Sequence, residues 1–253
     1  MAETQFIWLY LHKEAKGDEL RYSMRSVYQY FKGTPKITLV GDKPDWYCGH
    51  HISMPRIQEV PDTRFHSLFD TSHKLHTAIQ RDDIDDQFVV MMDDHYFLKP
   101  VTYNDLLVPR AQAGWKPRGS HWWDISITRT MQTLERYGKS THLFETHLMH
   151  VFEREKLLKI FNTFNMHNVP LARNTLYGNI YREYPQNCNP FVVSPQHKQS
   201  KQQLNKIAMS STVLNHASNC WDTTLRSWLN ARLQDPVEVE LCHETCNASP
   251  AVV

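Results

Sequence analysis

Glycine is scarce in this sequence. Eight of its 253 residues are glycine, less than half of the usual share of about 7%, and they stand singly. Neither G-x-G-x-x-G nor G-x-x-x-x-G-K-[ST] occurs. A Rossmann dinucleotide site and a P-loop both need several glycines, because only glycine lets the backbone approach a phosphate closely. The sequence therefore argues against both of these nucleotide-binding sites.

Long hydrophobic runs are also missing. The first apolar run covers residues 6–11 and has no basic segment before it, whereas a membrane span needs about 20 apolar residues. The sequence predicts no signal peptide and no membrane span. Five cysteines, an odd number, are scattered along the chain, which is typical of a reduced cytoplasmic protein. The segment 242–246, CHETC, lacks the second half of a zinc site, so free thiols are the favoured interpretation.

The net charge is close to zero, at +1. It provides no general attraction to nucleic acid or to an anionic membrane, and leaves room only for a local basic patch. A length of 253 residues predicts one large domain with a substantial core. The sequence is rich in histidine, tryptophan and tyrosine, with 15, 7 and 11 residues respectively. This abundance needs an explanation.

Strand-like and helix-like patterns alternate in the first hundred residues. Continuous apolar runs predict buried strands at 6–11, 36–40, 51–54 and 88–92. Apolar residues at helical spacing predict one helix between Asp18 and Gly33 and a second over 65–81. Strands that alternate with helices predict an α/β fold, with a mostly parallel sheet and helices on both faces.

The second half of the chain is less regular. Helices are predicted over 128–137, 153–161 and 223–233. The segment 187–203 is polar and punctuated by proline, so it is predicted to be a loop.

Two aspartates and a histidine, Asp93, Asp94 and His95, follow the fourth predicted strand. In an open parallel sheet, ligands bind beyond the carboxyl ends of the strands. Buried charges there are costly unless they are neutralised, and a Mg²⁺ or Mn²⁺ ion that bridges to a substrate diphosphate would neutralise them. On an extended backbone Asp93 and His95 would point to one side and Asp94 to the other. The alternative is an ordinary loop whose aspartates cap a turn.

Four segments, taken in order, resemble a known group of enzymes. The segment 19–26, ELRYSMRS, looks like the ELRYSLRS segment of the Stealth-type capsular polysaccharide transferases, and 36–46, KITLVGDKPDW, is similar to the strand, turn and P-x-W that follow there. The segment 93–98, DDHYFL, resembles their DD-x-F-L element with one extra residue, and 145–158 resembles a His-centred segment of related bacterial and phage sequences. More broadly, the order of strands and the acidic motif resemble the GT-A class of nucleotide-sugar glycosyltransferases.

One element of the Stealth group is absent. Its W-V-D-G opening has no counterpart, because residues 11–14 read LHKE. This departure favours ordinary glycosyl transfer over the sugar-phosphate transfer of that group.

The GT-A resemblance implies a GT-A-like α/β fold in which residues 1–110 bind a nucleotide-sugar donor and residues 111–253 form the acceptor-binding half of the same domain. It also implies a Mn²⁺ or Mg²⁺ ion on the donor diphosphate, with Asp93 and His95 as ligands and Asp94 in contact with the ribose or the donor sugar. Whether Asp94 or His95 is the second metal ligand stays open.

Five more residues of the first half are candidates for donor contacts. Arg21 and Arg25 lie one helical turn apart and suit a phosphate, or else are solvated charges of an amphipathic helix. Asp42 follows the second predicted strand at the same sheet edge and suits uracil or ribose, or else serves a turn. His73 and Lys74 lie on the helix before the acidic strand and suit the donor phosphate, or else are surface residues.

The candidates for acceptor contacts lie in the second half. Trp122 and Trp123 are adjacent and suit stacking of a sugar ring, or else pack in the core. Asp124 is a candidate general base for the acceptor hydroxyl. Glu145 and His147 are spaced two residues apart and suit a base or an added metal ligand, or else begin a helix.

The sequence as a whole predicts a cytoplasmic, metal-dependent glycosyltransferase that moves a sugar from a UDP-sugar to a hydroxyl acceptor. One alternative is a Stealth-like sugar-phosphate transferase. A second is an enzyme that glucosylates hydroxymethylated phage DNA, which a basic face would favour, made by Arg110, Lys116, Arg118 and Arg129. A third, non-enzymatic alternative is a carbohydrate-binding module that uses the same tryptophans.

Overall fold

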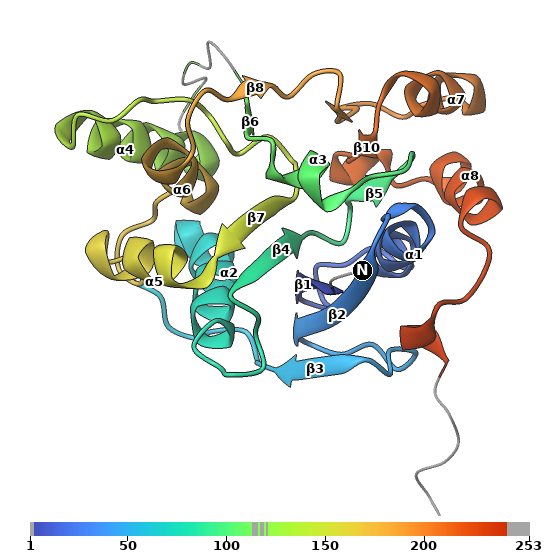
Figure 1. The fold of residues 1–253 in the computed structure, drawn as a ribbon, viewed down its shortest axis with the longest axis horizontal. Coiled ribbons are helices and arrows are strands. Elements are labelled where there is room, and N and C mark those ends of the chain that lie inside the picture. Colours follow the sequence, from blue (N-terminus) through green and yellow to red (C-terminus); the bar gives the residue numbers. More distant parts are fainter. Residues whose placement is uncertain (1–2, 113–115, 117–118, 120, 242–253) are drawn as a thin grey trace, which may run out of the picture.

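A five-stranded sheet forms the centre of the protein. The computed structural model describes residues 3–112, 116, 119 and 121–241. The strand order is β3-β2-β1-β4-β7 (Figure 1), and the strands are β1 (Glu3–Tyr10), β2 (Thr34–Gly41), β3 (His50–Ser53), β4 (Gln87–Met91) and β7 (His150–Glu153). The first four are parallel and β7 is antiparallel to β4. The predicted mostly parallel sheet is confirmed.

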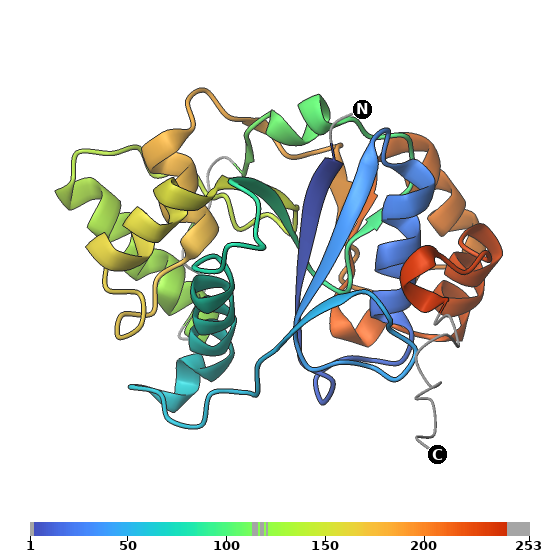
Figure 2. The same cartoon turned by 60° about the horizontal axis from the view of Figure 1, so that its bottom comes forward.

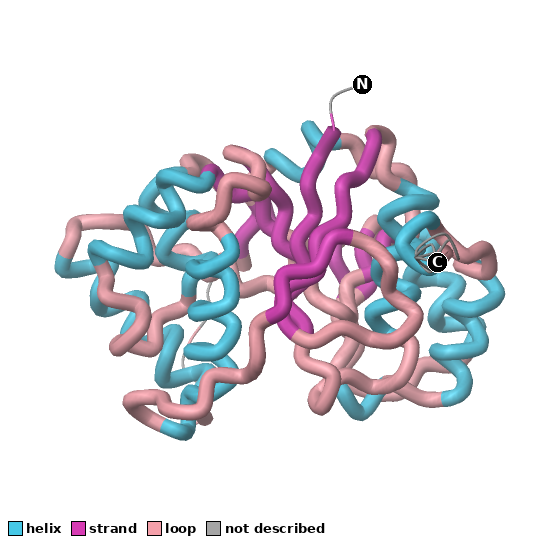
Figure 3. Tube along the Cα trace, turned by 90° about the horizontal axis from the view of Figure 1, so that it is seen from below, coloured by secondary structure: helices cyan, strands magenta, loops and turns pink. Residues whose placement is uncertain are grey.

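Helices cover both faces of this sheet, as predicted (Figures 2 and 3). Residues Phe6 and Trp8 of β1 pack with α1 (Glu19–Tyr30) on one face. Ile7 and Leu9 pack on the other face, together with α2 (His66–Ala78), α5 (Arg154–Thr163) and α6 (Arg173–Tyr181). Because both faces of β1 are buried, its sequence is apolar without alternation.

Short elements complete the second half. Two small sheets contain β5 (Tyr96–Phe97), β10 (Val213–Leu214) and β9 (Val192–Val193), and β6 (Arg110–Ala111) with β8 (Gln186–Asn187). The remaining α-helices are α3 (Tyr103–Leu107), α4 (Trp122–Arg136), α7 (Lys201–Ser210) and α8 (Thr223–Arg232). The described chain also contains the 3₁₀ turns η1 (Thr63–Phe65), η2 (Ser218–Cys220) and η3 (Glu238–Glu240).

Two predictions about the second half are wrong. The helix expected from residue 128 begins at Trp122, where the His121 side chain accepts the Trp123 backbone N–H. The segment 187–203 is not one loop, because it contains β9 and the first turn of α7. A capping box between Ser200 and Gln203 starts α7 within this polar segment.

Two further features of the described chain are the state of its cysteines and the length of its helices. Cys48 is disulfide-bonded, whereas Cys188 and Cys220 are buried free thiols. The expectation that all five cysteines are reduced is therefore wrong for Cys48. In the described part of the chain, no helix is long and apolar enough to cross a bilayer. The segment 242–246 and its CHETC motif lie outside the described residues.

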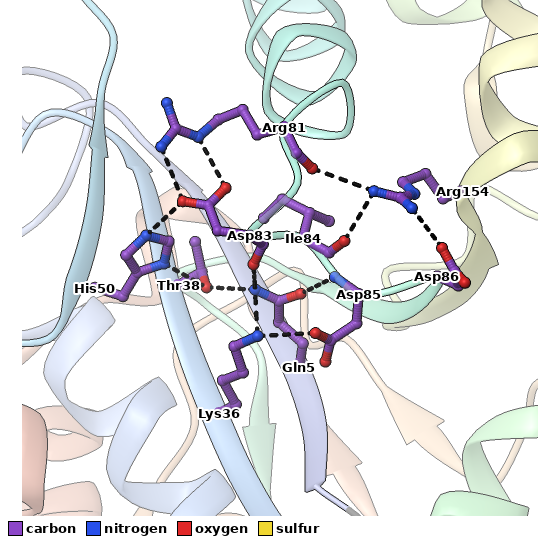
Figure 4. A network of polar contacts seen from close by, with 10 residues as sticks. All are labelled: Gln5, Lys36, Thr38, His50, Arg81, Asp83, Ile84, Asp85, Asp86 and Arg154. Atoms are coloured by element: carbon purple, nitrogen blue, oxygen red, sulfur yellow. Dashed lines mark hydrogen bonds and ion pairs between the residues drawn. The ribbon is translucent and has the colours of Figure 1, made fainter.

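At the amino ends of the strands, polar and charged side chains form hydrogen bonds and ion pairs with one another (Figure 4). The Gln5 amide of β1 donates to Thr38 of β2 (2.8 Å) and accepts the Asp85 backbone N–H (2.7 Å). The acidic loop before β4 forms three ion pairs: Arg81 with Asp83 (2.8 Å), Lys36 with Asp85 (2.8 Å) and Arg154 with Asp86 (2.6 Å). The Arg81 guanidinium is the main reason why the pKa of Asp83 falls to about 2.

Gly41, the last residue of β2, has a φ of 122°, and a Cβ there would collide with the Tyr10 carbonyl oxygen. We predict that Gly41→Ala lowers the free energy of unfolding by roughly 2–4 kcal/mol, because both strain and a backbone clash oppose it. Gly138→Ala is the control: Gly138 has a φ of 63° and open space around it, so its cost is about 1–2 kcal/mol. Urea denaturation measures both, and equal losses would contradict the prediction.

Candidate active site

The acidic segment after β4 is a turn held by α1. β4 ends at Met91, and the His95 backbone N–H donates back to the Met92 carbonyl (3.2 Å). The Ser23 hydroxyl of α1 donates to the His95 carbonyl (2.7 Å) and accepts from the Trp8 indole of β1 (2.9 Å). The backbone therefore turns here and is not extended. The prediction that Asp93 and His95 point to one side assumed an extended backbone, and this assumption is wrong.

Three carboxyl groups crowd around this turn. Burial, reinforced by Asp94, raises the pKa of Asp93 to about 7, and burial raises the pKa of Asp94 to about 6. Burial also raises the pKa of Glu19 to about 7, with further contributions from the charges of Asp93 and Asp94. In the described chain, no lysine or arginine forms an ion pair with Asp93 or Asp94. The turn therefore has negative charge without a matching cation.

His95 is a neutral imidazole at the base of the turn. It is buried, and burial lowers its pKa to about 3. Its Nδ1 accepts the Met92 backbone N–H (3.3 Å), so the neutral ring carries its proton on Nε2, which lies 4.0 Å from the Asp94 carboxylate. A protonated nitrogen has no lone pair for a metal, so this arrangement favours carboxylates over His95 as ligands. Among the described residues, no three His, Cys, Asp or Glu side chains are arranged to hold a metal.

Two of the predicted donor contacts lie at the carboxyl edge of the sheet. The Asp42 carboxylate accepts the His12 backbone N–H (2.9 Å) and so links the loops after β2 and β1. Lys74 is buried, with its Nζ 2.6 Å from the Asp70 carboxylate. The other oxygen of Asp70 accepts the Ile57 backbone N–H (2.8 Å). Asp42 thus joins two loops at the sheet edge, whereas Lys74 is held in an internal ion pair.

The other residues that were predicted to contact the sugar donor have their partners elsewhere in the protein. Arg25 donates to both oxygens of Glu240 (2.6 and 2.7 Å). Arg21 pairs with the same carboxylate (3.1 Å) and lies over the Trp46 ring. These two arginines thus fasten η3 to α1. His73 lies with its ring 6.5 Å from that of His167, outside the acidic turn.

A cavity of about 290 Å³ (the inner cavity) borders the acidic turn, and a second cavity of about 570 Å³ (the outer cavity) shares lining residues with it. Both are lined by four residues that the sequence singled out: Trp122, Trp123, Glu145 and His147. The inner cavity is completed by residues of α2, of the acidic turn and of α6: Ser67, Leu68, Thr71, Met92, His95, Ser126, Ile127, Leu148, Ala172, Arg173 and Asn174. The outer cavity is completed by Gln112, His121, Thr146, Cys188, Asn189, Val192, Ser194 and Gln196. Asp124, in the first turn of α4, lines neither cavity.

Glu145 and His147 differ in how much of their side chain is engaged. Glu145 accepts the Asn174 backbone N–H (2.9 Å) and the Asn174 side-chain amide (2.8 Å), and so holds the first turn of α6. Burial raises its pKa. His147 is exposed and has a φ of 53°, a left-handed conformation that is strained for histidine. Desolvation lowers the pKa of His147, which favours the neutral form of its ring.

Sequence reasoning gave no role to several residues of this region. Glu19 follows Asp18 at the start of α1, inside a quoted motif, yet nothing in its spacing showed that it would face Asp93. Arg173 and Asn174 were missed because α6 itself was not predicted.

Comparisons with known proteins give structural likeness only. No family model matches the chain, and no curated protein matches its sequence, so the likeness to the Stealth group stays a resemblance of motifs. Solved structures do match. An active-site mutant of LgtC has 9% identity and a TM-score of 0.49 over 94% of this chain and 100% of its own. The glycosyltransferase GlyE of Streptococcus pneumoniae TIGR4 has 11% sequence identity and a TM-score of 0.46, over 93% of this chain and 61% of its own.

A third match is a glycosyltransferase involved in the glycosylation of the major capsid of PBCV-1, with 12% identity and a TM-score of 0.41 over 92% of this chain and 99% of its own. Identities of 9–12% with TM-scores of 0.41–0.49 are too low to assign an activity to this chain.

The raised pKa values predict a stability that falls as pH rises. Asp93, with a pKa of 3.8 when unfolded and about 7 when folded, binds its proton more tightly in the folded state, so the free energy of unfolding decreases between about pH 4 and pH 7. We expect Asp93→Asn to reduce this slope in urea denaturations from pH 4 to 8. Asp83→Asn is the control, because the pKa of Asp83 is lowered to about 2 and it alters the slope only below pH 4. An unchanged slope in Asp93→Asn would contradict the prediction.

Proposed function

We propose that this protein is a metal-dependent glycosyltransferase of the GT-A class, which transfers a sugar from a nucleoside-diphosphate sugar, a UDP-sugar in our proposal, to a hydroxyl group. The observation that carries the proposal is a cavity lined by two tryptophans, a carboxylate and a histidine, which reaches Met92 and His95 of the acidic turn after β4. The motif resemblance to GT-A enzymes supports the same conclusion.

The position of the acidic turn in the sheet supports a nucleotide site there. The chain passes from β1 to β2 on one side, and β4 pairs with β1 on the other, so the strand order reverses between β1 and β4. In open α/β sheets, ligands bind at this reversal, beyond the carboxyl ends of the strands. Tyr10, Asp42 and Asp93 follow or end the strands at this point. We place the donor nucleotide over them.

The donor set of the turn fits a hard divalent cation. Mg²⁺ and Mn²⁺ prefer carboxylate oxygens and keep positions for phosphate and water. Asp93 and Asp94, whose pKa values are raised by burial, would hold it, with Glu19 close enough for their charges to raise its pKa as well. His95, the other ligand proposed from sequence, is the weaker candidate because of its tautomer. Such an ion, when bound, neutralises negative charge on a departing diphosphate.

The chain's own residues supply the acceptor side. Trp122 and Trp123 offer ring faces against which a sugar packs. His147 is the best candidate for the base that takes the proton of the acceptor hydroxyl, since desolvation favours its neutral ring and the residue lines both cavities. Glu145 is the second candidate, with both oxygens engaged by Asn174. Asp124 is the weakest, because it lines neither cavity.

No observation favours the alternatives. The guanidinium of Arg110 lies over Phe191 and that of Arg129 over Phe65, so each stacks on a different ring, and Arg118 lies outside the described residues. A carbohydrate-binding module would need the tryptophans but not the acidic turn, and metal dependence distinguishes the two. The cytoplasmic location stays a prediction.

Thermal denaturation tests the donor site. We expect Mn²⁺ together with UDP, at about 100 times the dissociation constant, to raise Tm by roughly 5 °C or more, and Asp93→Asn to abolish the rise. Asp86→Asn is the matched control, because Asp86 pairs with Arg154 at the opposite sheet edge and should leave the rise intact. No stabilisation by any nucleoside diphosphate with Mn²⁺ would refute the donor site. Stabilisation by UDP that persists in Asp93→Asn would remove Asp93 from the metal ligands.

Donor hydrolysis tests the base, with water as the acceptor. We predict that His147→Gln lowers kcat for UDP release from UDP-glucose or UDP-galactose about 10²-fold or more, because it removes the group that takes the proton. Asp124→Asn serves as the comparison and should retain activity within about threefold, since Asp124 lies outside both cavities. A large loss in Asp124→Asn with activity kept in His147→Gln would reverse the assignment.

A further inference from the structure

The inner cavity contains an arginine, Arg173, whose Nε has no hydrogen-bond partner among the described residues. Arg173, the first residue of α6, lines this cavity together with Trp122 and Trp123. Its Nε is buried and has no hydrogen-bond partner in the structure. Within the described residues, no carboxylate approaches the guanidinium to the 4.0 Å of an ion pair. Arg173 as a whole is partly buried, and its Nε retains an unused N–H donor.

The nearest opposite charge does not satisfy Arg173. Glu145 attracts it at a distance, but each carboxylate oxygen of Glu145 already accepts a hydrogen bond from Asn174. Burial lowers the pKa of Arg173 in spite of this attraction, which means that the surroundings disfavour its charge. An anionic group brought by a ligand would supply the missing acceptor and the missing charge.

The rest of the cavity suits a small ring. Two half-buried indoles provide apolar faces, and the volume of about 290 Å³ lies at the lower end of the roughly 300–1,000 Å³ that small-molecule sites occupy. Resting on the proposed glycosyltransferase function, we infer that the inner cavity binds an acceptor sugar that bears a carboxylate, such as a hexuronic acid. The carboxylate lies on the Arg173 guanidinium and the ring packs against Trp122 or Trp123.

A carboxylate suits the cavity better than a phosphate monoester. The planar guanidinium matches the two oxygens of a carboxylate in a bidentate arrangement. A phosphate monoester carries a charge near −2 at neutral pH, and Glu145 lines the same cavity, so a phosphate would be repelled more strongly than a carboxylate.

Isothermal titration with matched glycosides tests this inference. We expect methyl β-glucuronide to bind the full chain at least about tenfold more tightly than methyl β-glucoside, the uncharged equivalent, because a charge-assisted bond is gained. Arg173→Gln should remove the preference, and Arg173→Lys should keep part of it, since the charge remains but the planar fork is lost. Arg64→Gln is the control: Arg64 is exposed and pairs with Asp62 on the surface, so the preference should be unchanged.

Three results would overturn the inference: equal affinities or no binding of the two glycosides to the unaltered chain, a preference that survives in Arg173→Gln, or tighter binding of glucose 6-phosphate than of the glucuronide. Stabilisation by Mn²⁺ and UDP is measured in the same samples. If that stabilisation occurs without a glucuronide preference, the transferase proposal stands and the acidic acceptor fails. A glucuronide preference without stabilisation by Mn²⁺ and UDP would leave an acidic-sugar site in a protein that is not a transferase of the proposed kind.

Discussion

Burial of the parallel strands on both faces is the constraint on which the rest of this structure depends. Because β1 and its neighbours have no solvated face, their ionisable groups are confined to the two ends of the strands. At the amino ends, three of the four acidic residues in the loop before β4 pair with a lysine or arginine. At the carboxyl ends, Asp93 and Asp94 pair with neither in the described chain. The same residue type thus has a lowered pKa of about 2 in Asp83 and a raised pKa of about 7 in Asp93. This asymmetry makes one end of the sheet structural and leaves the other open to a ligand.

Whether an element could be predicted from the sequence depends on the interactions that form it. Strands such as β1 and β4 are buried on both sides, so their apolar runs stood out. α6 escaped because its buried side chains include Thr175 and Asn179, which bond to the segment before β7 instead of packing in an apolar stripe. α7 starts from a capping box in a polar segment, which by composition alone resembles a loop. Residues whose role is a polar contact across the fold leave no periodicity to detect.

The same reason separates the predicted from the unpredicted parts of the candidate site. Trp122, Trp123, Glu145 and His147 were chosen for their chemistry, and the fold brings all four to one wall. Arg21 and Arg25 were chosen in the same way, yet they bind Glu240, a residue more than 200 positions away that no local pattern could identify. The bend at Asp93–His95 depends on the Ser23 hydroxyl, again a contact between distant segments. Residue type could therefore suggest candidates, but only the tertiary contacts decide which of them meet.

The return of β7 to the sheet also has a consequence for how the chain folds. β4 is an edge strand until β7, residues 150–153, pairs with it, and β5 next to the acidic turn pairs with β10, residues 213–214. A chain emerging from the ribosome therefore exposes the edge of β4 until residues 150–153 have been synthesised, and the edge of β5 until residues 213–214 have. Contacts of such long sequence separation close large loops, so slow folding and a dependence on chaperones are the expected cost of this topology.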